Sequence, residues 1–244
     1  MRRLRVAGWI LLVAALTQVT IAEERDERSL ALANSVMEKM GGQEAWETTR
    51  FLQWDFFGGR THHWDRYSGD VRIEATFEDQ EYLFLMNINS RKGQVFKNGE
   101  LLPEGEELDA ALQQGYEVWV NDSYWMVMPY KLLDPGVSLA YLGERVMEDG
   151  TEADVVTMTF GDGIGVTPQN RYDLFIGKVS GLIEAWSFYA DAADEEPRFT
   201  LPWADWKRFG KILLATSHGQ DKDWAIAVHQ TLDRTTFTDP SLQD

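Results

Sequence analysis

This sequence offers few histidines and no cysteine for acid–base, nucleophilic or metal chemistry. Its four histidines are at positions 62, 63, 218 and 229. His62 and His63 are adjacent in a stretch that alternates like a strand, so they should point to opposite faces and not share one metal ion. With Asp65, either could still meet His218 or His229 in space, which leaves a hydrolase or a metal-dependent enzyme as an alternative. The expected place of the histidines is the surface or the rim of a barrel.

Other motifs associated with catalysis are incomplete. The loop GDGIG at 161–165 lacks the Lys-Ser/Thr ending of a phosphate-binding loop, and Pro168 argues against a helix directly after it. The sequence has no Gly-x-Ser-x-Gly nucleophile elbow. Its 40 acidic residues are too many for any one pair of carboxylates to stand out. We therefore expect no catalytic residue, no metal and no cofactor.

The composition predicts one acidic, exported domain. Residues 1–22 combine three arginines with an apolar run over 6–16 and small residues before Glu23, which is the pattern of a cleaved signal peptide. Because no cysteine follows it, the chain should be a soluble periplasmic protein of a bacterium and not a lipoprotein. Loss of the three arginines takes the net charge from −17 to −20, so nucleic acid and stable membrane insertion are not expected.

The spacing of apolar residues changes along the chain. A helical period predicts a helix over 26–40 that ends at Gly41-Gly42. A period of two then predicts strands, and Asn98-Gly99 predicts a tight hairpin. The expected strands are 51–56, 62–67, 71–77, 82–88, 93–97, 138–146, 154–160, 171–177 and 182–189, with 211–217 and 224–231 as a closing pair.

The stretch 108–136, LDAALQQGYEVWVNDSYWMVMPYKLLDPG, differs from the strands around it. Its apolar residues recur at three- and four-residue steps, so it should be a helix that ends or bends before Pro129. Its tryptophans and methionines could repack around a variable ligand, and we interpret the stretch as a lid. A helix that only plugs one end of a sheet is the alternative.

Hairpin-linked strands require antiparallel pairing. The expected fold is α+β and mainly β: a curved antiparallel sheet that forms an incomplete, half-open barrel wrapped around lid helices, in one domain over 23–244. Strand parity and the lid together predict an apolar ligand pocket. Its expected contacts are Trp54, Phe56, Ile73, Phe77, Phe84, Met86, Trp119, Trp125, Met126, Met128, Trp186 and Phe188.

This order of elements resembles that of the periplasmic lipoprotein carriers LolA and LolB and their wider superfamily of secreted half-barrel proteins. The segment RYDLFI at 171–176, followed by SGLI at 180–183, is similar to a strand-turn-strand unit of that superfamily. The stretches WDFFGGRTHHWDRYSGDVRIE and WMVMPYKLLDPGVSLAYLG resemble a secreted bacterial branch of it. The resemblance implies a concave apolar face, covered by helices, that holds acyl chains. No single position here matches the lid-locking arginine of the carriers.

The leading hypothesis is a non-catalytic protein of the bacterial envelope that binds or carries a hydrophobic or acylated ligand, such as a lipid or a lipoprotein. The enzyme that would use His62, His63, Asp65 or His229 is one alternative. The other is a structural module in which the aromatic residues only fill a packed core.

Overall fold

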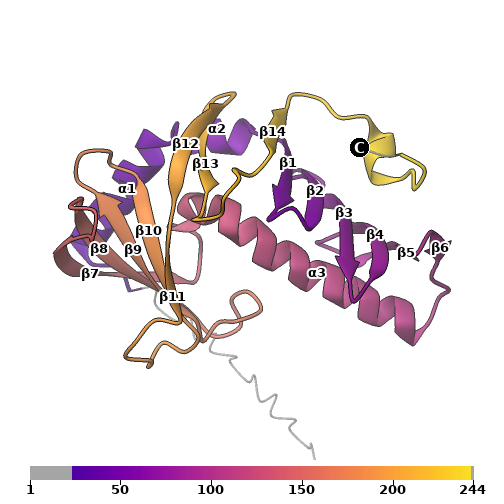
Figure 1. Ribbon diagram of the computed structural model, residues 1–244, viewed down its shortest axis with the longest axis horizontal. Helices are drawn as coiled ribbons and strands as arrows, with labels where there is room; N and C mark the ends of the chain where they lie inside the picture. The colour runs from indigo at the N-terminus through magenta and orange to yellow at the C-terminus, as the bar shows by residue number, and fades with distance from the viewer. Residues whose placement is uncertain (1–23, 243–244) are drawn as a thin grey trace, which may run out of the picture.

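The computed structural model describes residues 24–242, and Figure 1 shows how its elements follow one another. The helices are α1 (Glu27–Lys39), α2 (Gln43–Thr48) and α3 (Glu106–Val127), with 3-10 turns η1 (Met128–Lys131) and η2 (Arg234–Phe237). The strands before α3 are β1 (Phe51–Phe56), β2 (Arg60–Asp65), β3 (Asp70–Phe77), β4 (Gln80–Asn87), β5 (Lys92–Lys97) and β6 (Glu100–Leu101). Those after it are β7 (Val137–Val146), β8 (Glu152–Phe160), β9 (Arg171–Gly177), β10 (Ile183–Tyr189), β11 (Phe199–Pro202), β12 (Ala204–Phe209), β13 (Ile212–Ser217) and β14 (Ile226–His229).

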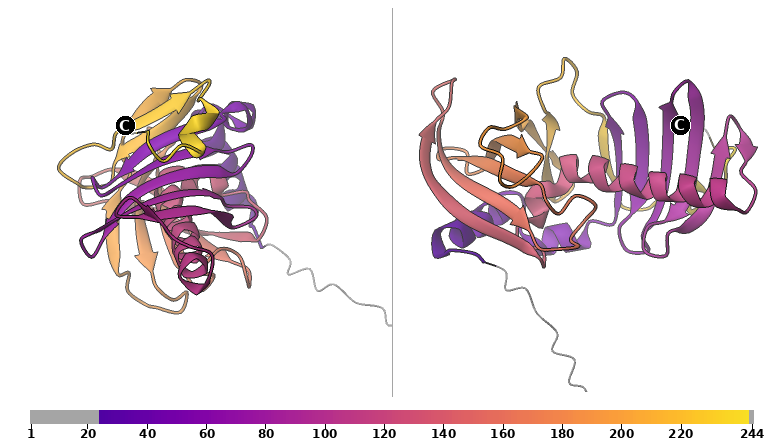
Figure 2. Two further views of the ribbon diagram at one scale, coloured as in Figure 1. Left: turned by 90° about the vertical axis from the view of Figure 1, so that its right-hand side faces the viewer. Right: turned by 90° about the horizontal axis from the view of Figure 1, so that it is seen from below.

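The described strands form three antiparallel sheets. Their orders are β14-β1-β2-β3-β4-β5-β6, β11-β10-β9-β8-β7 and β12-β13. Backbone hydrogen bonds link the sheets, from the Trp203 amide to the Glu184 carbonyl and from the Trp224 amide to the Thr216 carbonyl. The strands therefore follow one another as an open belt, and seen end-on in Figure 2 they curve round α3. This confirms curved antiparallel sheets that do not close into a barrel, although the belt is divided into three sheets.

The closing pair expected over 211–217 and 224–231 is wrong. β13 pairs with β12, whereas β14 pairs with β1 along the edge of the seven-stranded sheet. Alternation of apolar residues marks a strand but does not identify its neighbour, because every strand of the belt alternates in the same way.

Local sequence signals explain where several elements begin and turn. The Asp26 carboxylate caps α1 by accepting a hydrogen bond from the Ser29 amide at 2.9 Å. Gly41 follows this helix at φ 124°, and a Cβ there would lie 2.4 Å from the Lys211 carbonyl oxygen, so only glycine fits. The predicted hairpin at Asn98-Gly99 is confirmed: both residues have positive φ, and Lys97 pairs with Glu100 across them.

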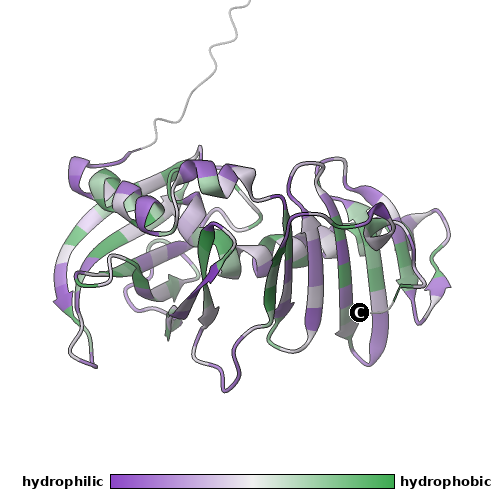
Figure 3. Cartoon of the chain, turned by 90° about the horizontal axis from the view of Figure 1, so that it is seen from above, coloured by the Kyte–Doolittle hydropathy of each residue, from purple (hydrophilic) through white to green (hydrophobic). Residues whose placement is uncertain are grey.

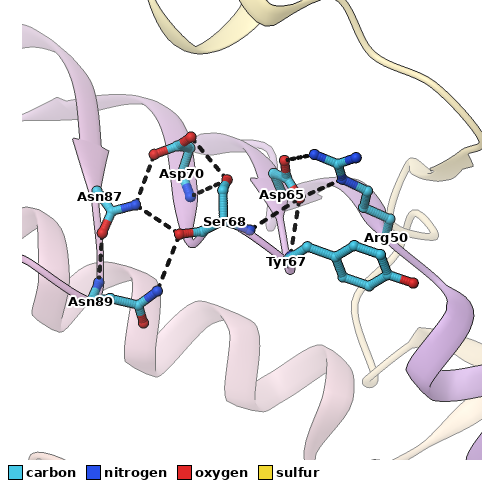
Figure 4. A network of polar contacts seen from close by, with 7 residues as sticks. All are labelled: Arg50, Asp65, Tyr67, Ser68, Asp70, Asn87 and Asn89. Atoms are coloured by element: carbon cyan, nitrogen blue, oxygen red, sulfur yellow. Dashed lines mark hydrogen bonds and ion pairs between the residues drawn. The ribbon is translucent and has the colours of Figure 1, made fainter.

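A polar network fixes the turns at one end of the seven-stranded sheet (Figure 4). The Arg50 guanidinium donates two hydrogen bonds to the Asp65 carboxylate, at 2.9 and 2.7 Å. Further along the same end, the Asn87 amide donates to the Ser68 carbonyl and to the Asp70 carboxylate, both at 2.8 Å. Asp65 is thus engaged in holding the turn between β2 and β3.

The predicted helix in the middle of the chain is the longest among the described residues; it runs along the seven-stranded sheet and ends beside the five-stranded sheet, as Figure 2 shows. We call α3 and η1 together the lid segment. Its first half packs on β3, β4 and β5 in one hydrophobic cluster, and its second half joins a larger cluster with α1, α2 and the five-stranded sheet. In Figure 3 the hydrophobic residues alternate along the strands with hydrophilic ones.

The expected signal peptide, residues 1–22, lies outside the described residues. Among those that are described, no helix is both long and apolar enough to cross a membrane.

Candidate functional site

A pocket of about 590 Å³ lies between the second half of α3 and the five-stranded sheet. This volume falls within the roughly 300–1,000 Å³ of small-molecule sites. One wall comes from α3, from Tyr116 to Trp125, and continues into the turn after η1. The opposite wall is formed by β8 to β11 and by the loop 161–170.

Aromatic rings make up most of the strand wall. Trp186 and Phe188 are two residues apart on β10 and so share one face, and the register places Phe188 opposite Tyr172 on one side and Phe199 on the other. The Tyr172 and Trp186 rings stack at 5.0 Å and 4°, and Trp125 from α3 meets Trp186 edge to face at 4.8 Å. The deep part of the pocket is therefore a preformed apolar surface.

Tyr124 and Tyr172, which border the pocket from α3 and β9, stay neutral at neutral pH. Burial raises the pKa of Tyr172 from its ordinary value, against the effect of a hydrogen bond from Asn170. Burial likewise raises the pKa of Tyr124 far above its usual range. Neither phenol supplies a negative charge at neutral pH.

The rim of the pocket is polar and carries no net charge. Its two charged residues, Lys131 and Asp134, neutralise each other in an ion pair of 2.5 Å. The other polar side chains are amides and hydroxyls: Asn121, Ser123, Thr167, Gln169 and Asn170. The site can thus bury a neutral, largely apolar molecule without leaving an ionic group unpaired.

The loop 161–170 forms part of this rim, and glycines shape it. Gly163 and Gly165 adopt φ of 76° and 71°, and between them Ile164 packs against Gly136, the residue that ends the turn after η1. Ile164 and Val166 both border the pocket and remain 37% and 39% exposed. A loop with two half-exposed apolar side chains is unlike an ordinary solvated turn.

A buried ionic cluster holds the second half of α3 to the seven-stranded sheet. Asp122 on α3 is fully buried and accepts two hydrogen bonds from the Arg60 guanidinium, at 2.6 and 2.8 Å. The His62 Nε2 lies 2.7 Å from the same carboxylate, and Trp54 stacks on the imidazole at 4.4 Å. We call Arg60, His62 and Asp122 the clamp.

Two opposing effects set the protonation states in the clamp. Burial raises the pKa of Asp122, but hydrogen bonds from His62 and Arg60 outweigh it, so this pKa is lowered. Burial lowers the pKa of His62 and outweighs the attraction of Asp122. The His62 Nδ1 is buried without an acceptor, which also disfavours a second proton on the ring. The clamp therefore contains ionised Asp122, cationic Arg60 and neutral His62.

A second histidine completes the end of α3. Pro129 has no N–H to offer to the carbonyl of Trp125, four residues earlier. The His218 Nε2 lies 2.7 Å from that carbonyl oxygen and takes the place of the missing donor. Burial lowers the pKa of His218 to about 4, so the ring is neutral and carries one N–H. The Nδ1 lies 2.8 Å from the Ser217 carbonyl oxygen, and the bond to Trp125 forms in the Nε2–H tautomer.

The expected surface or rim position of the histidines is wrong for three of the four. His62, His63 and His218 are all buried, and two of them support α3. His229 is partly buried, and its Nε2 lies 2.8 Å from the Gln53 side-chain oxygen. Within residues 24–242, no group of three histidine, aspartate or glutamate side chains could hold a metal ion.

The structure divides the twelve predicted ligand contacts. Four border the pocket: Trp119, Trp125, Trp186 and Phe188. The other eight pack elsewhere, in the two hydrophobic clusters: Trp54, Phe56, Ile73, Phe77, Phe84, Met86, Met126 and Met128. The first half of α3 packs directly on β3 and β4, and for that reason these strands contribute no residue to this pocket.

Sequence reasoning missed several pocket residues. Tyr124, Phe160, Tyr172 and Phe199 border the pocket from α3, β8, β9 and β11, and the loop 161–170 adds apolar contacts. The sequence did contain one signal: Ile164 and Val166 are apolar residues in a glycine-rich loop, where polar residues are more usual. Phe199 had no such signal because β11 is short and follows an acidic loop.

Comparison with known proteins gives similarity in structure but not in sequence. No protein-family model matches the chain, and none of the curated proteins does. A DUF1329 family protein from Desulfovibrio piger ATCC 29098 is similar in structure with a TM-score of 0.45 and 12% identity, over 88% of this chain and 99% of that one. A domain named for outer membrane lipoprotein sorting, from Vibrio parahaemolyticus, is similar with a TM-score of 0.36 and 12% identity, over 87% of this chain and 97% of that one. MucB is similar with a TM-score of 0.27 and 17% identity, over 67% of this chain and 53% of that one.

Proposed function

We propose that this chain binds a hydrophobic or acylated molecule in the pocket between α3 and the five-stranded sheet, and that it carries out no catalysis. The observation that supports this most directly is the pocket itself. Its walls are aromatic, its rim is uncharged overall, and the lid segment covers it. Large apolar walls with a few polar groups at the edge are typical of sites for apolar ligands.

The energetics favour an alkyl or acyl chain as the buried part. Transfer of a chain from water gains about 0.8 kcal/mol per CH₂, so about 12 CH₂ groups contribute on the order of 10 kcal/mol before losses of motion are subtracted. The rings of Trp125 and Trp186 contact each other and form a wall that is complete without ligand. Because the wall is preformed, little of that gain is spent on ordering the site.

The ligand comes from the bacterial envelope in this proposal. Support comes from the basic, apolar and small-residue pattern of residues 1–22, and from the absence of cysteine in the sequence. A lipid or the acylated end of a lipoprotein is the class of cargo that such a location supplies. Export can be tested directly by the N-terminal sequence of protein recovered from a periplasmic extract.

A cavity-filling variant tests the binding site. Ala190 borders the pocket just after β10, so Ala190→Trp should fill part of it and weaken binding of a fluorescent fatty acid by about tenfold or more. Ala193 is exposed three residues later and does not border the pocket, so Ala193→Trp is a matched control for the added ring. Shortening the alkyl chain of the probe should weaken binding by about fourfold per CH₂.

Two results would count against the proposal in different ways. If the unaltered protein takes up no alkyl probe of any length, it is not a carrier of acyl chains. If it does, but Ala190→Trp binds as well as Ala193→Trp, the ligand occupies another site.

A further inference from the structure

The pocket changes character along α3. Near Trp125 it is enclosed by Trp186 and Phe199, with ring centroids 4.8 and 5.8 Å from that of Trp125. Six and nine residues earlier on the helix, its wall is formed by Trp119 and Tyr116. Figure 2 shows that this earlier part of α3 runs along the seven-stranded sheet, away from the five-stranded sheet. An amphiphile with its chain among the deep rings would therefore have its headgroup near Trp119.

The rings at this end are held in place by their neighbours. Tyr116 and Trp119 lie 6.1 Å apart with 35° between their planes. The Arg91 guanidinium lies 4.1 Å from the Tyr116 ring, and Trp64 meets Trp119 edge to face at 5.1 Å. Both rings remain partly exposed, so they offer a positioned aromatic surface beside the pocket.

Apart from Arg91, which lies over the Tyr116 ring but does not border the pocket, the polar side chains at this end are neutral. Asn121 projects from the same stretch of α3, and Thr167 and Gln169 come from the loop across the pocket. Amides and hydroxyls both donate and accept hydrogen bonds, which suits a partner with many hydroxyl groups. Such a partner with an apolar C–H face could also bury that face on the aromatic rings.

Charge disfavours ionic headgroups. The only cation among the described pocket residues is Lys131, and Asp134 neutralises it. A phosphate, sulfate or carboxylate would lose water there without gaining an unpaired cation among the residues that border the pocket, since Arg91 is already engaged with the Tyr116 ring. The net charge of −17 repels such a group at longer range. The headgroup that fits is neutral.

We propose that the amphiphile bound by this chain carries a neutral, multiply hydroxylated headgroup, a glycosyl or polyol group, that packs on Tyr116 and Trp119 and hydrogen-bonds to the amides and hydroxyls of the rim. This inference rests on the proposed function, because it assigns the headgroup of the ligand whose chain the pocket holds.

Three probes with the same alkyl chain separate the two ideas. Dodecyl maltoside, dodecylphosphocholine and dodecanoate are titrated by calorimetry below their micelle concentrations. The maltoside should bind tightest, by about tenfold over the other two, as expected for one or two net hydrogen bonds. Equal affinities would overturn the headgroup inference and leave chain binding intact. Absence of binding by all three would remove the proposed function and this inference with it.

Two variants then test the surface itself. Trp119→Ala should reduce maltoside affinity about fivefold and leave dodecanoate affinity within twofold, whereas Trp119→Phe should restore most of the loss. Gln169→Ala removes a rim amide and should weaken only the maltoside, and Gln113→Ala, on the exposed face of α3, is its control. Equal losses for maltoside and dodecanoate, with unchanged far-ultraviolet circular dichroism, would refute a headgroup role for these side chains.

Discussion

The clamp predicts that one buried carboxylate contributes more to stability than any exposed ion pair of this protein. In Asp122→Asn, the Arg60 guanidinium loses an anionic partner at 2.6 and 2.8 Å. The new NH₂ group of the asparagine also takes the place of one acceptor oxygen. The Asp122 side chain is fully buried and the Arg60 side chain is 25% exposed, so water can replace only part of the lost partner. Breaking a buried ion pair on one side costs about 3–5 kcal/mol, and we expect Asp122→Asn to lower the free energy of unfolding by that amount.

Urea denaturation, followed by tryptophan fluorescence and by circular dichroism, measures this difference. Asp134→Asn is the matched control, because Asp134 is also an ion-paired carboxylate, just after the lid segment, but its side chain is 41% exposed. This variant should change the free energy of unfolding by about 1 kcal/mol at most. Adding Arg60→Met to Asp122→Asn removes the unpaired guanidinium, so the double variant should be more stable than the sum of the two single losses implies. A loss below about 1 kcal/mol for Asp122→Asn, or strict additivity, would refute the assigned role of the clamp.

Two further perturbations test the packing and protonation of the lid segment. Burial lowers the pKa of His218 to about 4, below its value of roughly 6.5 in the unfolded chain. Between these two pH values only the unfolded state binds a proton. The free energy of unfolding should therefore fall by about 2 kcal/mol from pH 7 to pH 5. His218→Gln keeps a donor for the Trp125 carbonyl and should reduce this fall without abolishing it, because the pKa of His62 is also lowered. An unchanged pH dependence of stability would contradict a neutral, buried His218. Gly115→Ala would place a Cβ 2.6 Å from a Phe84 ring carbon and should cost about 1–3 kcal/mol in urea denaturation, while Gln113→Ala on the exposed face should stay within about 0.5 kcal/mol.

The fold was largely predictable because its signals are local. Alternation located most of the strands, though not β6, β11 and β12, which are short or follow the acidic loop. Asn98-Gly99 located a hairpin, and Pro129 located the end of α3. Pairing was not predictable where it joins distant segments, as β14 joins β1 across 169 residues of intervening chain. The roles of His62 and His218 depend on partners at 122 and 125, and no spacing in the sequence indicates those contacts.

The pocket was only partly predictable, because parity tells which face of a strand is apolar but not what covers it. On the first sheet the cover is close: Ala111 and Gly115 are the small residues with which α3 approaches β4, and the space there is filled by Phe84 and Met86. On the five-stranded sheet the same helix presents Trp119, Tyr124 and Trp125, whose rings separate it from the strands. The change from small to large side chains along one helix therefore accompanies the change from direct packing on the first sheet to a pocket beside the five-stranded sheet.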